Sequence, residues 1–192
     1  MSVNLEKNKS LSLTKDNSKL RHVQICLGWD IGDKENFDLD ASLFMLNEKG
    51  KVNSEKDFVF YNNLESSCKS VTHTGDNRTG GGADNEDDEV IEVDLKKVPQ
   101  SVHKLLAVVT IHDAEKRRQH FGKVKNSFIR LVNKNNEEEI CKFTLDEDSK
   151  NESSMIFGEI VRDGSEWSFK ALGQGVKGGL RRLCESYGIA VD

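Results

Sequence analysis

The sequence predicts an all-β protein, a sandwich of two mainly antiparallel sheets that ends in one short helix. Three observations lead to this prediction. Apolar residues alternate with polar or small ones in several segments, turn residues separate these segments at short intervals, and few segments have helical spacing. No linker and no internal repeat divides the chain, so a single domain is expected over residues 1–192.

The expected strands follow from alternating patterns and from short runs of β-branched and aromatic residues. The segment 105–111 is apolar on both faces, which is typical of a central strand. The other expected strands lie at 23–29, 37–45, 58–61, 91–95, 128–132, 140–145, 155–160 and 167–172.

Two segments have helical character. The segment 179–187 is predicted to be a helix that ends at Gly188, and the highly charged segment 113–121 is predicted to be a short one. In the first of them, apolar side chains fall at i, i+3, i+4 and i+7, namely Leu180, Leu183, Cys184 and Tyr187.

Composition excludes several classes of protein. With 28 basic and 33 acidic residues the net charge is −5, so a nucleic-acid partner is not expected. The first residues lack the apolar core of a signal peptide, and no apolar stretch is long enough to span a bilayer, so a cytoplasmic protein is expected. The four cysteines are widely spaced and contain no CxxC pair, which argues against zinc and against a disulfide framework.

Two acidic segments, 28–40 and 75–89, lie where strands are expected to end. In the first, Asp38 and Asp40 are two residues apart in a strand pattern, so both should project from the face opposite the core. The second combines oxygen-bearing side chains with the glycines 80–82, which allow the backbone to curl. Calcium prefers such oxygen ligands, so a calcium site is one interpretation of these loops, and a solvated acidic loop is the other.

The acidic loops do not form an EF-hand. Counting from Asp38 places Leu43 where glycine is required and Lys49 where glutamate is required, and counting from Asp76 places Arg78 at the third ligand position. A calcium site in this chain must therefore be assembled from separate loops at one end of the sandwich.

The same segments resemble the TerD family of tellurium-resistance proteins. The similarity runs in the order of the family over nearly the whole chain, and the combination of FDLDAS with GDNRTG is specific. The matching segments are LGWD at 27–30, FDLDAS at 37–42, FVFYNNL at 58–64, HTGDNRTG at 73–80, VTIHDAEKRRQHFG at 109–122, SFIRLVN at 127–133, EWSFKALGQG at 166–175 and GGL at 178–180.

The resemblance implies a calcium-binding β-sandwich, similar in layout to a C2 domain, that holds one or two calcium ions in its acidic loops. It implies a non-enzymatic role in stress response and tellurite resistance, together with other Ter proteins, including the membrane protein TerC, at the inner face of the membrane. The ligands carried over by motif are Asp30, Asp38, Asp40, Asp76, Asn77, Gly80, Asp87, Asp88 and Glu89.

One segment departs from the family pattern. Residues 81–86 make the second loop about two residues longer than is usual, so two ligand registers remain open, one through 87–89 and one through 84–86. The first is preferred because the apolar strand pattern at 90–95 follows it directly.

Several motifs have competing interpretations. Residues 173–178 match GxGxxG, but too little chain follows for a second parallel strand, so no dinucleotide is expected and the segment is interpreted as a turn. His73 and His112 lie near the acidic loops in the motif order, either as structural side chains or as supports of the ligands. The basic run 116–118 is either a solvated face or a contact for acidic lipid or a partner.

Three function classes follow. A calcium-dependent interaction module is favoured, a C2-like calcium-dependent lipid binder with peripheral membrane association is the second, and a cysteine-dependent reductase of tellurium oxyanions is the third.

Overall fold

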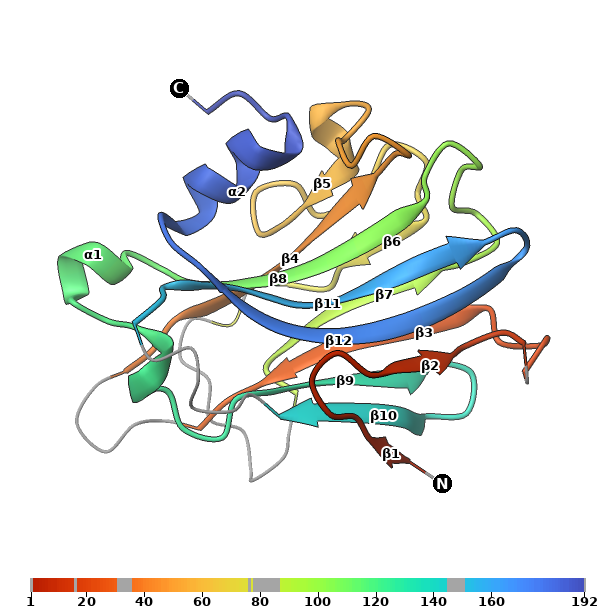
Figure 1. Cartoon of the computed structure of the whole chain (residues 1–192), viewed down its shortest axis with the longest axis horizontal. Helices are drawn as coiled ribbons and strands as arrows, with labels where there is room; N and C mark the ends of the chain where they lie inside the picture. Colours follow the sequence, from red (N-terminus) through yellow and green to blue (C-terminus); the bar gives the residue numbers. More distant parts are fainter. Residues whose placement is uncertain are drawn as a thin grey trace.

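The computed structural model describes residues 2–15, 17–30, 36–75, 77, 87–144 and 151–191. Within these residues the strands form two six-stranded sheets, which pack against each other as a sandwich (Figure 1). The first sheet has the order β1 (Val3–Asn4), β10 (Glu138–Thr144), β9 (Phe128–Asn133), β3 (His22–Gly28), β7 (Glu89–Asp94) and β6 (Val71–His73). The second has the order β2 (Ser10–Ser12), β12 (Glu166–Val176), β11 (Ser154–Asp163), β8 (Lys104–Ile111), β4 (Leu39–Leu46) and β5 (Phe58–Val59).

The main hydrophobic core lies between the two sheets. Alternate side chains of each strand point into it, for example Ile25 and Leu27 from β3 and Leu43 from β4. Among the described strand pairs, only β1 with β10 is parallel, and the others are antiparallel. The predicted all-β sandwich is therefore confirmed.

A second apolar cluster covers the outer face of the second sheet, where helix α2 (Gly179–Tyr187) packs. The ring of Phe44 on β4 stacks on Phe58 with centroids 4.2 Å apart and meets Tyr187 of α2 at 5.0 Å. The helix uses the apolar stripe predicted from its sequence, and it ends at Gly188, which has a positive φ. Within the described residues, no helix is both long and apolar enough to cross a membrane.

Each strand expected from the sequence is present, with ends that differ by a few residues. The segment 105–111 belongs to β8, which lies between β11 and β4 as expected of a central strand. Strands β1, β2 and β6 were missed because two or three residues are too few to establish a period. Of these, β1 and β2 place the start of the chain at one edge of each sheet (Figure 1).

Two expectations need correction. The helix expected at 113–121 is limited to α1 (Ala114–Arg117) and a separate 3-10 turn η2 (Phe121–Lys123), because Asp113 and Arg118 at its ends adopt positive φ angles. The segment 173–178 is not a turn throughout. Strand β12 continues to Val176, and only the last two residues form the turn before α2.

Candidate metal centre

The described parts of the two acidic segments meet at one end of the sandwich, where β3 of the first sheet ends and β4 of the second begins. The backbone N–H of Trp29 donates to Asp88 Oδ2 at 3.0 Å, and the N–H of Ala41 donates to Glu89 Oε2 at 2.6 Å. These bonds join the first segment to the second through carboxylates of the second. The sequence placed both segments at strand ends, and the sheet topology brings those ends together.

Asn77 connects the start of the second acidic segment to its end through two hydrogen bonds. Its backbone N–H donates to Glu89 Oε1 at 3.2 Å, and its side-chain Nδ2 donates to Asp88 Oδ1 at 3.2 Å. Three of the predicted ligands, Asn77, Asp88 and Glu89, are therefore assembled into one hydrogen-bonded group.

Glu89 points into the sandwich rather than toward solvent. It is 1% exposed, and it lies on the same face of β7 as the core residues Ile91 and Val93. Burial raises the pKa of its carboxyl group, while the nearby imidazole of His73 and the backbone N–H of Ala41 act in the opposite direction. The carboxylate connects the two sheets, because it sits on β7 and accepts from β4.

His73 lies beside this carboxylate on β6. The backbone N–H of Gly75 donates to His73 Nδ1 at 3.2 Å, so Nδ1 accepts and the imidazole proton is assigned to Nε2. That nitrogen faces Glu89 Oε2 at 3.6 Å. The contact is therefore assigned as an imidazole N–H directed at a carboxylate, in support of Glu89.

Asp38 and Asp40 occupy the other side of β4. Their neighbours Phe37, Leu39 and Ala41 point into the main core, as predicted, so Asp40 projects from the outer face of the second sheet. His112 adjoins both residues. Its backbone N–H donates to the carbonyl of Asp38 at 2.8 Å, and its Nδ1 lies 3.6 Å from Asp40 Oδ2. Asp40 therefore lies on the outer side of β4, whereas Glu89, which belongs to β7, contacts β4 from the core side.

The remaining predicted ligands have separate partners. The backbone N–H of Asp30 donates to the carbonyl of Lys125 at 3.1 Å, and its carboxylate accepts from the side chain of Asn126. Asp87 accepts two hydrogen bonds from Arg130, at 2.7 and 2.8 Å, and so points toward β9. The seven predicted ligands that the structure describes therefore take several orientations around one end of the fold.

Part of the predicted ligand set lies outside the described residues, namely Asp76, Gly80 and the alternative register 84–86. In the part of the chain that is described, no three His, Cys, Asp or Glu side chains are close enough to hold a metal ion. The donor chemistry nevertheless suits calcium, because the side chains gathered here offer carboxylate and amide oxygens. Strand β7 begins at Glu89, the last residue of the preferred register 87–89.

Three side chains around these loops were not identified from the sequence. Arg130 holds Asp87, Asn126 contacts Asp30, and Gln119 donates from Nε2 to the carbonyl of Asn36 at 3.0 Å. One signal was available for the first, since Arg130 is the only charged residue within the apolar run 128–132. Its partner depends on the register of β9, β3 and β7, which the sequence does not provide.

The cysteines are free in this structure, with Cys26, Cys141 and Cys184 buried and Cys68 half-buried. Burial is the main cause that raises the pKa of the Cys26 thiol well above its usual range, that of Cys141 to about 12 and that of Cys184 to about 11. These three thiols therefore lack the thiolate character that a reactive cysteine needs.

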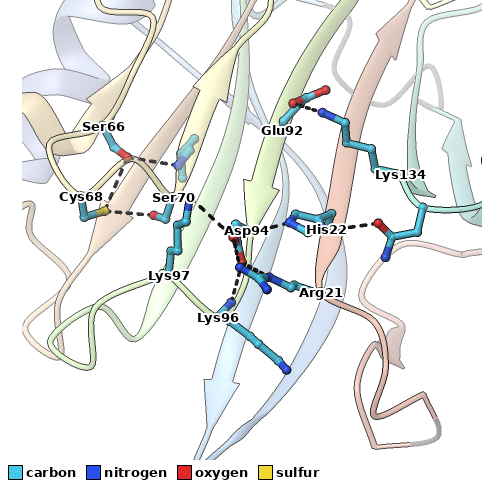
Figure 2. A network of polar contacts seen from close by, with 12 residues as sticks. Arg21, His22, Ser66, Cys68, Ser70, Glu92, Asp94, Lys96, Lys97 and Lys134 are labelled. Atoms are coloured by element: carbon cyan, nitrogen blue, oxygen red, sulfur yellow. Dashed lines mark hydrogen bonds and ion pairs between the residues drawn. The ribbon is translucent and has the colours of Figure 1, made fainter.

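The opposite end of the first sheet carries a different charged group, centred on Asp94 (Figure 2). Arg21 forms two hydrogen bonds to Asp94, at 3.1 and 2.9 Å, while His22 Nε2 lies 3.5 Å away and Lys97 Nζ 3.9 Å away. Figure 2 shows these side chains converging on Asp94. Asp94 ends β7, whereas Glu89 begins it. The contacts of Arg21 and His22 with Asp94 join the start of β3 to the end of β7.

Asp94→Asn is expected to lower the free energy of unfolding at pH 7 by about 1 kcal/mol, because the Arg21 bonds lose their charge and Arg21 is itself half-exposed. The hydrogen bond of Arg21 holds the pKa of Asp94 below its usual value. The stabilisation is therefore present above the unfolded-state pKa of about 3.9 and is lost as pH falls through the lower folded-state pKa.

Urea unfolding of both proteins at pH 7 and near pH 2 measures this difference, with the exposed Asp163→Asn as the matched control. The gap between wild type and Asp94→Asn should close in acid. A gap of equal size at both pH values would contradict the assignment to the ionised pair.

Comparison with known proteins adds independent information. A family model described as the TerD domain matches residues 1–187. The tellurium resistance protein TerD of Serratia marcescens is 51% identical over 191 residues, which cover 98% of each chain. General stress protein 16U of Bacillus subtilis is 45% identical over 194 residues and is matched along the full length of both chains.

A solved structure supports the fold. The crystal structure of a homologue of the telluride resistance protein (TerD) from Streptomyces coelicolor aligns with a TM-score of 0.69, covering 89% of this chain and 99% of that one. The sequence identity of this pair is 18%, so the likeness concerns the arrangement of the strands.

Proposed function

Because the chain belongs to the TerD family, we propose that it is a stress-response protein of tellurium resistance that binds calcium and acts through partners rather than by catalysis. The names of its relatives support the stress and resistance role. Tellurium resistance is named for the Serratia marcescens relative, and general stress for the Bacillus subtilis one.

The calcium proposal rests on one observation, the meeting of the two acidic loops through Asp88 and Glu89. Each carboxylate oxygen has two lone pairs, so an oxygen that accepts a backbone N–H retains a position for a metal ion. These bonds also orient the carboxylates in advance, which lowers the cost of assembling a site.

The residues divide the work in this proposal. Asp88 and Asn77 bind the ion from the second loop, Asp30 and Asp38 from the first, and Glu89 holds both loops to β4. Asp76 and Gly80 are proposed to complete the set from the part of the loop that lies outside the described residues. When bound, one or two calcium ions would supply positive charge that offsets the repulsion among these carboxylates.

Other Ter proteins are the proposed partners, including the membrane protein TerC, and the proposed location is the cytoplasm at the inner face of the membrane. In this arrangement the acidic end of the sandwich is the part whose charge and order change when calcium binds, so it is the proposed contact surface.

Calorimetric titration of metal-free protein with calcium tests the binding proposal directly. We expect a saturable heat with a stoichiometry of one or two and a much weaker response to magnesium, which prefers a tighter octahedral shell. Growth of tellurite-challenged cells that carry the chain with or without its acidic ligands tests the resistance role. The absence of any saturable calcium heat would remove the metal from the proposal.

A calcium-dependent lipid binder is the second candidate. Lys116, Arg117 and Arg118 are exposed on and after α1, which Gln119 joins to the first acidic loop at Asn36. Cations beside a metal-loaded loop would suit acidic lipid headgroups. Sedimentation with phosphatidylserine vesicles, with and without calcium, separates this candidate from a protein-binding module. Sedimentation only with calcium would favour the lipid binder.

A further inference from the structure

The ion pair of Arg130 and Asp87 directs one predicted ligand away from the others. Arg130 on β9 donates from Nε to Asp87 Oδ1 at 2.7 Å and from Nη2 to Asp87 Oδ2 at 2.8 Å. The remaining terminal nitrogen reaches Glu139 at 3.2 Å. The pair is partly shielded, since the two side chains are 28% and 20% exposed. The bond to Asp87 is the main reason that the pKa of Arg130 is raised.

The next two residues face other directions. Asp88 accepts from Trp29 and Asn77, and Glu89 accepts from Ala41, so both belong to the loop junction. Asp87 is instead paired with a planar guanidinium that matches both of its oxygens.

We propose that Arg130 is a built-in competitor of calcium for Asp87. In the metal-free protein Arg130 neutralises Asp87 and holds it against β9, and Asp87 exchanges the guanidinium for the metal when calcium binds. This inference rests on the proposed calcium function, and it names the Arg130–Asp87 pair as one determinant of the calcium affinity. In the metal-free protein, Arg130 thereby reduces the repulsion among the acidic side chains. The free energy of the Arg130–Asp87 pair is lost when calcium binds, so it weakens calcium binding by that amount.

Cys26 offers a second readout of the exchange. It is the register partner of Arg130 across β3 and β9, it is 1% exposed, and its thiol lies against Asp87. Movement of Asp87 toward the acidic loops should open this cover. Calcium should therefore speed the labelling of Cys26 by a maleimide, followed site by site by mass spectrometry, while Cys184 on the buried face of α2 should be unaffected.

The test is a double-mutant cycle on the whole chain by calcium calorimetry, with Arg130→Gln, Asp87→Asn and both together. Arg130→Gln should raise calcium affinity about threefold to tenfold, the range expected when a partly shielded ion pair no longer competes. In the Asp87→Asn background the same change should give no gain. Arg130→Lys keeps the charge but not the paired geometry, so it should give a smaller gain and provides a folded alternative.

Lys134→Gln is the matched control, because Lys134 lies just beyond β9 and pairs with Glu92 instead (Figure 2). It should leave the affinity unchanged. An equal gain from Arg130→Gln in both backgrounds, or no gain in wild type, would overturn the competition while leaving calcium binding intact. Failure of wild type and all variants to bind calcium would overturn the proposed function together with this inference.

Discussion

Calcium is expected to raise the melting temperature by about 5–10 °C, and Asp76→Ala is expected to abolish most of that rise. At free calcium about 100-fold above the dissociation constant, one site that binds only the folded state adds about 2.7 kcal/mol. For a chain of 192 residues, each kcal/mol corresponds to about 2–4 °C. This stabilisation assumes that only the folded chain binds calcium, because the unfolded chain cannot assemble ligands from two distant segments.

Thermal unfolding with calcium, with magnesium and with chelator measures this effect. Asp38→Ala should reduce the calcium response strongly, whereas Asp33→Ala should not, because Asp33 lies in the same acidic segment but outside the matched motifs. A melting temperature indifferent to calcium, in wild type and in Asp76→Ala alike, would mean that the loops are solvated acid.

The strands were predictable because their patterns are long relative to the two-residue period. The alternation of Phe37, Leu39 and Ala41 gave the faces of β4 correctly, and with them the outward direction of Asp40. The predicted helix at 179–187 matched α2 for the same reason, since its apolar stripe covers two full turns. The prediction of one helix at 113–121 was wrong because Asp113 and Arg118 adopt positive φ angles, which the identity of these residues does not predict.

The candidate site was predictable in its location and less so in its geometry. Acidic residues at strand ends indicated where Asp88 and Glu89 would meet the first loop. The sequence could not show that the buried Glu89 accepts from the backbone of Ala41, because that contact depends on how the two sheets stack. It also could not pair Asp87 with Arg130, because the two residues are more than forty positions apart in sequence. Their contact depends on the strand register that places Arg130 on β9 opposite Cys26 on β3.

Glu89→Ala is expected to lower the free energy of unfolding by about 3 kcal/mol, even without calcium. The carboxylate is the acceptor for the buried N–H of Ala41 at 2.6 Å and for the N–H of Asn77 at 3.2 Å, and the imidazole of His73 is directed at it. Its loss leaves the two backbone N–H groups without this acceptor, and a buried donor that loses its acceptor costs about 1–3 kcal/mol. Glu89→Gln should cost less, because its amide oxygen can still accept one of these hydrogen bonds. Some cost should remain, because its NH2 group then faces the other backbone donor.

Glu92→Ala provides the matched control for this prediction. It is the same substitution three residues along β7, but Glu92 is half-buried on the outer face and pairs with the exposed Lys134, so a loss of at most about 1 kcal/mol is expected. Urea unfolding in chelator separates this structural role from metal binding. Equal stability of Glu89→Ala and Glu92→Ala would show that the buried carboxylate does not hold the sheets together. A large loss for Glu89→Ala alone would mean that this predicted ligand joins β7 to β4 before any ion binds, so its variants must be compared at matched stability when calcium affinity is measured.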